Sequence, residues 1–251
     1  MREFEIREEL TLAASPEQVW DAIATGPGVD SWFMGHSEIE PREGGINRLE
    51  MPGYAQESTI TAWEPGRHYA FRGDDTDGTF AAFEFLIEAR DGGSSVLRCV
   101  HNFSLDDDWE AQYDGIKEGD AMHLRKLVAY LAHFPGRTSK FNLFLFGPVV
   151  SDDAKIWSTF AEALFVNEIS EGAPVRLNVP GLPAAEGVID SVLPPHVVGA
   201  HTPNGILMVA KGYRDVLFAE YHGFSDDEDE KEVQTALQSW LGTAFVSTST
   251  V

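Results

Sequence analysis

Apolar and polar residues alternate along two segments in the first half of the chain. Phe83, Phe85 and Ile87 are separated by single residues, and so are the members of a second set, Leu97, Cys99, His101 and Phe103. Successive side chains of a strand point to opposite faces, so each set lies on one face. Pairs such as Pro65-Gly66 and Gly92-Gly93 separate the apolar segments, as turns do in an antiparallel meander. The pattern predicts a sheet with one apolar face.

A short helix is predicted between the first strand and this meander. Ser15-Pro16-Glu17 has the order of an N-cap, a first-turn proline and a first-turn acid, which starts a helix over residues 16–24. The Gly-Pro-Gly run that follows is expected to end it. Residues 29–34 are then expected to form a second helical turn that sets Trp32 and Phe33 against the sheet.

A longer helix is predicted over residues 109–134. Its apolar stripe recurs at near-helical spacing and includes one acid, with the members Tyr113, Ile116, Asp120, Leu124, Leu127, Leu131 and Phe134. Asp106-Asp107-Asp108 come directly before it, and their carboxylates suit the positive end of a helix dipole.

Three landmarks of the first half recur in the same order in the second half. Residues 15–20 correspond to 151–157, Pro52-Gly53 to Pro180-Gly181, and His101-Asn102-Phe103-Ser104 to His222-Gly223-Phe224-Ser225. A shared order at a period above 100 residues indicates a duplicated domain and excludes short-unit repeats. We therefore expect two domains, at residues 1–137 and 138–251.

The second copy is the smaller one. The interval from Trp20 to Pro52 encloses 31 residues, whereas that from Trp157 to Pro180 encloses 22, and the closing helix is also shorter. The second copy thus lacks much of the element at residues 29–33 and has a shorter closing helix, so we expect a filled, structural copy. Its first strand, over residues 141–150, is apolar almost throughout, which predicts burial on both faces.

The motifs of the first copy resemble those of a known superfamily. They lie in order at residues 15–20, 29–33, 41–45, 63–65 and 101–103, and are similar to those of the START/Bet v 1-like (SRPBCC) superfamily, in particular its AHSA1-like (activator of Hsp90 ATPase homologue) branch. The resemblance covers about residues 3–134. It implies an α+β helix-grip fold, a curved antiparallel sheet around a long C-terminal helix with an apolar cavity between them. Together with the repeat, it predicts this fold duplicated in tandem, with a reduced second copy.

The charge of the chain limits its partners. It has 41 acidic against 18 basic residues, a net charge of −23, which disfavours binding to nucleic acids and to anionic membranes. No apolar stretch approaches the roughly 20 residues that span a bilayer. The first residues also lack the pattern of a signal peptide, so we expect a cytoplasmic protein.

No cofactor or metal is expected. Cys99 is the single cysteine, which excludes an intramolecular disulfide and a cysteine-rich zinc site. His196 and His201 lack ligand spacing, and residues 226–230 lack the alternating ligands of a calcium loop. We find neither a phosphate-binding glycine loop nor a dinucleotide fingerprint.

Aromatic residues and one histidine form the candidate ligand site of the first copy. The aromatic set comprises Trp32, Phe33, Trp63, Phe71, Phe83, Phe85, Phe103, Trp109 and Tyr113. It could surround a small apolar or aromatic ligand, or simply fill the core. His101 could anchor a polar group or act as acid or base, or be a core histidine, as its apparent equivalence to His222 favours. Asp120 either has a buried partner or reaches water at the edge of the helix stripe.

Three classes of function stay open. The favoured one is binding of a small hydrophobic molecule, with no catalysis assumed. A cyclase-like or hydratase-like enzyme would need two facing titratable groups, for which His101 and Asp120 are the available pair. A chaperone-interaction or regulatory module would instead bind a protein partner. Glu220 and His222, which share a strand face, are interpreted as a structural pair because no nucleophile motif accompanies them.

Overall fold

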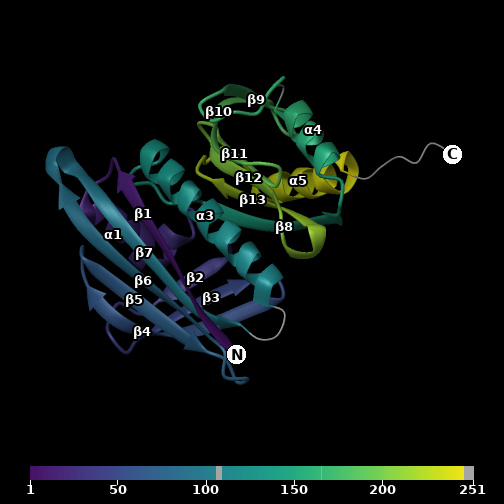
Figure 1. Cartoon of the computed structure of the whole chain (residues 1–251). Coiled ribbons are helices and arrows are strands. Elements are labelled where there is room, and N and C mark those ends of the chain that lie inside the picture. The colour runs from purple at the N-terminus through teal and green to yellow at the C-terminus, as the bar shows by residue number, and fades with distance from the viewer. Residues whose placement is uncertain (106–108, 165, 246–251) are drawn as a thin grey trace. The chain divides into compact units, whose positions relative to one another are not determined.

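The computed structural model describes residues 1–105, 109–164 and 166–245 (Figure 1). The chain divides into two compact units, of which the first comprises Met1–Asp120 and Tyr130–Thr138 and the second Ala121–Ala129 and Ser139–Val251. The predicted helix-capping cluster Asp106-Asp107-Asp108 lies outside the described residues.

The first unit is built on a seven-stranded antiparallel sheet. Its elements are β1 (Arg2–Leu12), α1 (Pro16–Ala24), α2 (Gly26–Val29), β2 (His36–Ile39), β3 (Ile46–Met51), β4 (Tyr54–Glu64), β5 (His68–Asp74), β6 (Phe80–Arg90), β7 (Ser94–Leu105) and α3 (Trp109–His133). The strand order is β1-β7-β6-β5-β4-β3-β2, so that the first strand pairs with the last. The middle of α3, residues 121–129, is counted with the second unit.

Alternation and capping account for these elements. Phe83 pairs with His101, Phe85 with Cys99 and Ile87 with Leu97, so the two predicted apolar sets face the same side of the sheet. At the start of α1, the Ser15 hydroxyl accepts a hydrogen bond from the Gln18 amide, and the Gln18 side chain accepts one from the Ser15 amide. This capping box satisfies two backbone N–H groups that the helix leaves unpaired.

The short helix after α1 begins earlier than predicted. Helix α2 spans Gly26–Val29, whereas we expected a helical turn over residues 29–34. It therefore includes the Gly-Pro-Gly run that follows the first helix. The Thr25 hydroxyl caps it by accepting from the Gly28 amide, and Pro27 lies in the first turn, where its missing N–H has no intrahelical acceptor to lose. Helix α1 ends at Ala24 as predicted, and the glycine and proline that follow start a second helix.

The second unit is built on a six-stranded antiparallel sheet. Its elements are β8 (Phe141–Val149), α4 (Asp153–Ala163), β9 (Pro174–Leu177), β10 (Ala185–Leu193), β11 (Val197–His201), β12 (Gly205–Lys211), β13 (Val216–Gly223) and α5 (Glu230–Ala244). The strand order is β8-β13-β12-β11-β10-β9.

The two units share one topology. Each runs from a strand through a helix into an antiparallel meander and ends in a helix, and in each the first strand pairs with the last. The second unit has one strand fewer, and α5 has 15 residues where α3 has 25. The predicted α+β fold with a reduced second copy is therefore confirmed.

Strand β8 is less buried than its sequence suggested. Leu143 and Leu145 lie in the core of the second unit with Leu237 and Trp240 of α5, but Phe146 is 49% exposed. Burial on both faces was thus wrong at this end of the strand, because alternate side chains of an antiparallel strand face opposite sides and only one side here contacts the core.

Within the described residues, no helix has both the length and the apolar character to cross a membrane.

Candidate functional site

A continuous row of aromatic rings lines one face of the first sheet. Trp63, Tyr69, Phe71, Phe83, Phe85, His101 and Phe103 come from β4 to β7 and share this face by register. Ring centroids are 5.4 Å apart for Trp63 and Tyr69 and 5.4 Å for Phe71 and Phe83. Trp20 of α1 packs on Trp63 at 4.9 Å. We call these eight residues the aromatic face.

The row continues at the start of α3. Trp109 and Tyr113 each contact Phe4 of β1, with ring centroids 5.3 and 5.2 Å apart, and Tyr113 lies 6.2 Å from Phe103. Seven of the nine nominated aromatic residues therefore lie in one connected row. Trp32 is held differently, because its indole N–H donates to the Ala22 carbonyl at 2.8 Å, and Phe33 packs on it.

The aromatic face is buried in part only. Tyr69, Phe85 and Phe103 are buried, whereas Trp63, Phe71 and Phe83 keep an intermediate exposure. Trp63, Phe71 and Phe83 are therefore the members of the face that keep contact with solvent.

His101 and Asp120, which we nominated from the sequence, contact each other. His101 Nδ1 lies 2.8 Å from Asp120 Oδ2, with side-chain exposures of 8% and 17%. The imidazole also stacks on Phe83 at a centroid distance of 3.9 Å. In the neutral imidazole, a carboxylate beside Nδ1 places the proton on that nitrogen, so that Nε2 carries the lone pair and accepts hydrogen bonds. Nε2 is buried and has no hydrogen-bond partner among the described residues.

Tyr69 is a member of the site that the sequence analysis missed. Its side chain is 1% exposed, and among the described residues its hydroxyl has no hydrogen-bond partner. Burial raises the pKa of Tyr69, so the hydroxyl stays protonated. The spacing of Tyr69 and Phe71 repeats that of Phe83 and Phe85, and this alternation was the signal that could have found it.

Cys99 pairs with Phe85 in the next row of the same face. Burial raises the pKa of its thiol, and the nearby charge of Asp120 raises it further. The single cysteine is therefore a neutral, buried thiol rather than a nucleophile.

Glu220 and His222 belong to a buried ionic cluster of the second unit. Lys126 Nζ is in direct contact with Glu220 Oε2 and lies 3.3 Å from His222 Nε2, while His123 Nδ1 is 3.9 Å from the same glutamate oxygen. Burial lowers the pKa of Lys126, and the charge of Glu220 opposes this shift. Burial likewise raises the pKa of Glu220, and the charge of Lys126 opposes that shift. Lys126, which the sequence analysis did not single out, is 1% exposed.

His222 is not the counterpart of His101 in space. Leu217, Ala219 and Tyr221 of β13 face the core that contains α4 and α5. Phe218 alternates with these residues along the strand and contacts the cluster that contains Met122 of α3 instead. His222 points to the same side as Phe218 and contacts Lys126 of α3. His101 lies on the helix-covered face of its own sheet and His222 on the opposite face. The equivalence that favoured a core histidine at position 101 was therefore wrong.

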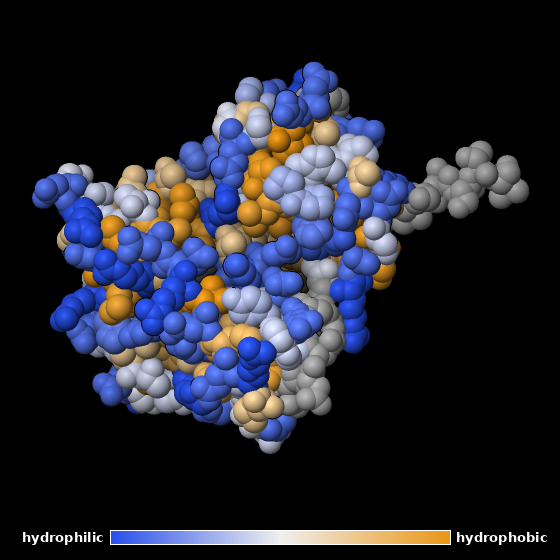
Figure 2. All heavy atoms as spheres, in the orientation of Figure 1, coloured by the Kyte–Doolittle hydropathy of each residue, from blue (hydrophilic) through white to orange (hydrophobic). Residues whose placement is uncertain are grey.

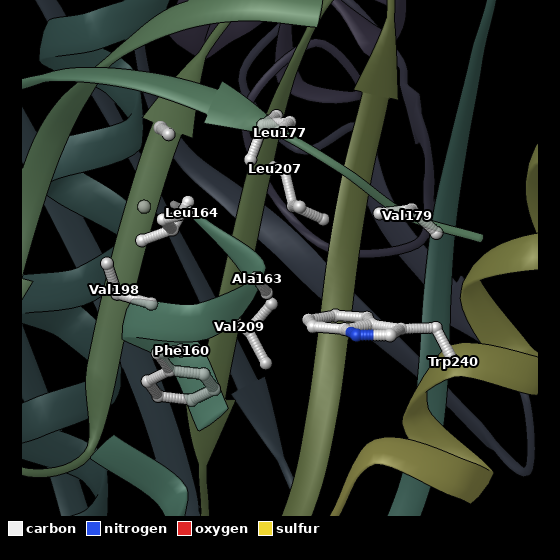
Figure 3. A pocket seen from close by; sticks show the side chains of 11 residues that line it. Phe160, Ala163, Leu164, Leu177, Val179, Val198, Leu207, Val209 and Trp240 are labelled. Atoms are coloured by element: carbon white, nitrogen blue, oxygen red, sulfur yellow. The ribbon is translucent and has the colours of Figure 1, made fainter. Parts of the chain in front are cut away.

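A small apolar hollow lies in the second unit, which we expected to be filled. Figure 3 shows the side chains around it, among them Phe160 of α4, Val209 of β12 and Trp240 of α5. Its volume of about 20 Å³ only slightly exceeds the roughly 10–15 Å³ that one water requires, and an apolar wall gives water no partner.

Hydrophilic residues cover most of the molecular face that Figure 2 shows, in keeping with the net charge of −23.

Comparison with solved structures finds similar chains at low sequence identity. The Aha1 dimer from Colwellia psychrerythraea is 19% identical over 51% of this chain and 96% of its own, with a TM-score of 0.43. SA2116 from Staphylococcus aureus, described as of unknown function, is 16% identical over 52% and 94%, with a TM-score of 0.47. DynU16, described as a putative protein in the dynemicin biosynthetic locus, is 16% identical over 96% and 95%, with a TM-score of 0.45. Curated proteins gave no match.

A family model matches the part of the chain that carries the aromatic face. Residues 13–132 match the family described as activator of Hsp90 ATPase homolog 1-like protein, an interval that begins just after β1 and reaches the last turn of α3. Residues 13–132 are therefore similar to the AHSA1-like branch of the START/Bet v 1-like superfamily, in agreement with the resemblance found in the sequence.

Proposed function

We propose that the aromatic face of the first unit binds a small apolar or aromatic molecule that donates a hydrogen bond to His101 Nε2. The buried Nε2, which has no hydrogen-bond partner in the part of the chain that the structure describes, carries this proposal. Leaving a buried acceptor unpaired costs about 1–3 kcal/mol, and a ligand hydroxyl or N–H would recover that cost. Asp120 supports the role because it fixes the imidazole in the accepting tautomer.

The surroundings of His101 favour a flat, neutral ligand. The imidazole lies between Phe83 and Phe103, at centroid distances of 3.9 and 4.7 Å. Rings of this kind pack well against another ring, and small-molecule sites are mostly apolar with few polar groups. The Asp120 carboxylate and the net charge of −23 disfavour an anion.

This proposal assigns ligand binding to residues 1–137 and a structural role to residues 138–251. The family model is equally compatible with a regulatory module that binds a protein, which would take first place if the site proved empty of any small molecule. Location in the cytoplasm stays a prediction from the sequence.

Native mass spectrometry of the full chain, purified without added ligand, is the first test, because a retained small molecule would identify the ligand class. Calorimetric titration with 2-naphthol and naphthalene is the second. We expect His101→Phe to weaken 2-naphthol about five- to tenfold, the worth of one hydrogen bond, and to leave naphthalene unaffected.

His68→Phe is the matched control. His68 lies on the same sheet, but it contacts Glu84 at 2.9 Å on the opposite face. Absence of binding to the wild type, or an equal response of both probes to His101→Phe, would contradict the proposal.

Proton transfer is a second candidate function, favoured by the His101 and Asp120 geometry. An imidazole whose Nδ1 is bound to a carboxylate is arranged as a general base at Nε2. With 2-tetralone in D2O, Nε2 would remove the proton beside the carbonyl and return a deuteron. We expect deuterium uptake, followed by NMR, to be accelerated by the wild type but not by His101→Phe or Asp120→Asn. Equal uptake with all three proteins would exclude this function.

A further inference from the structure

The aromatic face contains a second buried polar atom without a partner. Among the described residues, the Tyr69 hydroxyl shares this property with His101 Nε2 within the first unit. Tyr69 contacts Trp63, Phe71 and Phe85, with ring centroids 5.4, 5.4 and 6.2 Å away. Packing on several sides holds the ring in place, so the hydroxyl has little freedom to find another partner by itself.

Other buried tyrosines of the chain do have partners. The Tyr221 hydroxyl of β13 lies 2.9 Å from both carboxylate oxygens of Glu228. The Tyr130 hydroxyl of α3 donates to the Arg137 carbonyl at 2.6 Å. Buried hydroxyls are expected to be satisfied in this way. The exception at Tyr69, which has no partner among the described residues, therefore leaves a hydrogen bond open to a bound molecule.

Sheet register fixes how far apart the backbone positions of Tyr69 and His101 lie. Tyr69 pairs with Phe85, which pairs with Cys99, while the neighbouring row on the same face runs from Phe71 through Phe83 to His101. Tyr69 and His101 are thus two strands and two residues apart, which corresponds to about 12 Å between their Cα atoms. Both side chains project from the same face, and a molecule of two fused rings with a substituent at each end covers such a span.

We propose that the Tyr69 hydroxyl is the second polar contact of the site, and that the ligand is a flat aromatic molecule of at least two rings with a hydroxyl at one end and a carbonyl oxygen at the other. This inference rests on the proposed function. The ligand hydroxyl donates to His101 Nε2 of the neutral tautomer described above, and the ligand carbonyl accepts from the Tyr69 hydroxyl. The two contacts together fix the orientation of the ligand along the row of rings.

Three probes separate the two contacts by calorimetric titration of the full chain: 2-naphthol, 2-acetylnaphthalene and 6-hydroxy-2-acetylnaphthalene. We expect Tyr69→Phe to weaken both acetyl compounds about five- to tenfold and to leave 2-naphthol unchanged. His101→Phe should weaken both hydroxyl compounds and leave 2-acetylnaphthalene unchanged. The compound with both groups should bind the wild type most tightly.

The outcomes distinguish this inference from the proposed function. Binding that responds to His101→Phe but not to Tyr69→Phe, or that Tyr69→Phe weakens equally for all three probes, overturns the role of Tyr69 and leaves the site intact. Failure of the wild type to bind any probe overturns both proposals.

Thermal unfolding without ligand gives an independent check. Because the Tyr69 hydroxyl has no partner among the described residues, Tyr69→Phe should melt at or above the wild-type temperature, whereas Tyr221→Phe, the matched control, should melt lower. Equal losses in the two variants would show that the Tyr69 hydroxyl is already bonded within the protein, and would overturn the inference.

Discussion

The histidines of the repeated motif, His101 and His222, show how the two copies diverged. His101 lies on the helix-covered face of its sheet, where Asp120 fixes one nitrogen and leaves the other as an unpaired acceptor. His222 lies on the opposite face of the second sheet, beside Lys126 and Glu220. The same motif has thus given one histidine suited to a ligand and one confined to a buried ionic cluster.

The surroundings of the two histidines also differ in the free energy that is needed to bury their charged side chains. Lys126 and Glu220 are each 1% exposed, and two buried charges are tolerated only while they compensate each other. Asp120 keeps a 17% exposure of its side chain, so it retains contact with solvent. Removing a charge should therefore matter far more in the second unit than in the first.

Lys126→Met is expected to have the largest effect. It leaves Glu220 buried without its counter-charge, which typically costs about 3–5 kcal/mol. Urea unfolding followed by far-ultraviolet circular dichroism measures the loss in free energy of unfolding. In the first unit, Asp120→Asn should cost less than about 1.5 kcal/mol, because it removes one part-buried hydrogen bond.

The double variant Lys126→Met/Glu220→Leu is the control for this prediction. It removes both charges and should recover most of the stability, as apolar replacement of buried ion pairs often does. A loss in Lys126→Met no larger than that in Asp120→Asn would show that the cluster is hydrated, and would abolish the contrast between the units.

His123 should give the second unit an acid sensitivity of intermediate size. Burial lowers the pKa of His123 well below its usual 6.5, and the charge of Lys126 lowers it further. Below pH 6.5 the unfolded chain then binds a proton that the folded chain does not, so stability falls as pH falls, by up to about 1.4 kcal/mol per pH unit.

Urea unfolding between pH 7.5 and 5.5 measures this slope, and His123→Gln should reduce it. Comparison with the variant is needed because Glu220 works in the opposite sense: its raised pKa makes the folded chain gain stability as pH falls through it. Identical slopes for His123→Gln and the wild type would mean that His123 titrates normally in the folded protein.

The smallest expected effect concerns the hollow of the second unit. Val209→Ile adds one methylene at the wall of this hollow and should change the free energy of unfolding by less than about 1 kcal/mol, in the stabilising direction. Val197→Ile, on the other side of the sheet with Met122 and Met208, should destabilise by roughly 1–3 kcal/mol through overpacking. Chemical denaturation of both variants tests this, and the reverse order would mean that the hollow is already filled.

Much of the first unit could be predicted because its signals are local. Alternation along β6 and β7 predicted which residues share a face of the sheet. The apolar face of the strands includes His101 and the apolar stripe of the helix includes Asp120, so the two residues could be nominated as a pair. The same argument from alternation would have placed Tyr69 on this face, since it lies two residues before Phe71. It was missed because we did not interpret a single pair of aromatic residues as one face of a strand.

The ionic cluster of the second unit could not be predicted in this way. Lysine is rarely buried completely, so nothing in the sequence near Lys126 indicated that it faces a sheet. The position of His222 failed for a different reason. A shift of one residue moves a side chain to the other face of a strand, and a motif matched by residue type does not define that register.

The pairing of first and last strands sets the order in which each copy can form. Arg2 pairs with Leu105 in the first copy, and Phe141 with Gly223 in the second, so on the ribosome each opening strand must wait until nearly the whole unit has been synthesised. Contacts this distant in sequence slow folding. While it waits, β1 is protected by its alternating charges, whereas β8 exposes the run from Leu143 to Phe146, a segment of the type that promotes aggregation between nascent chains.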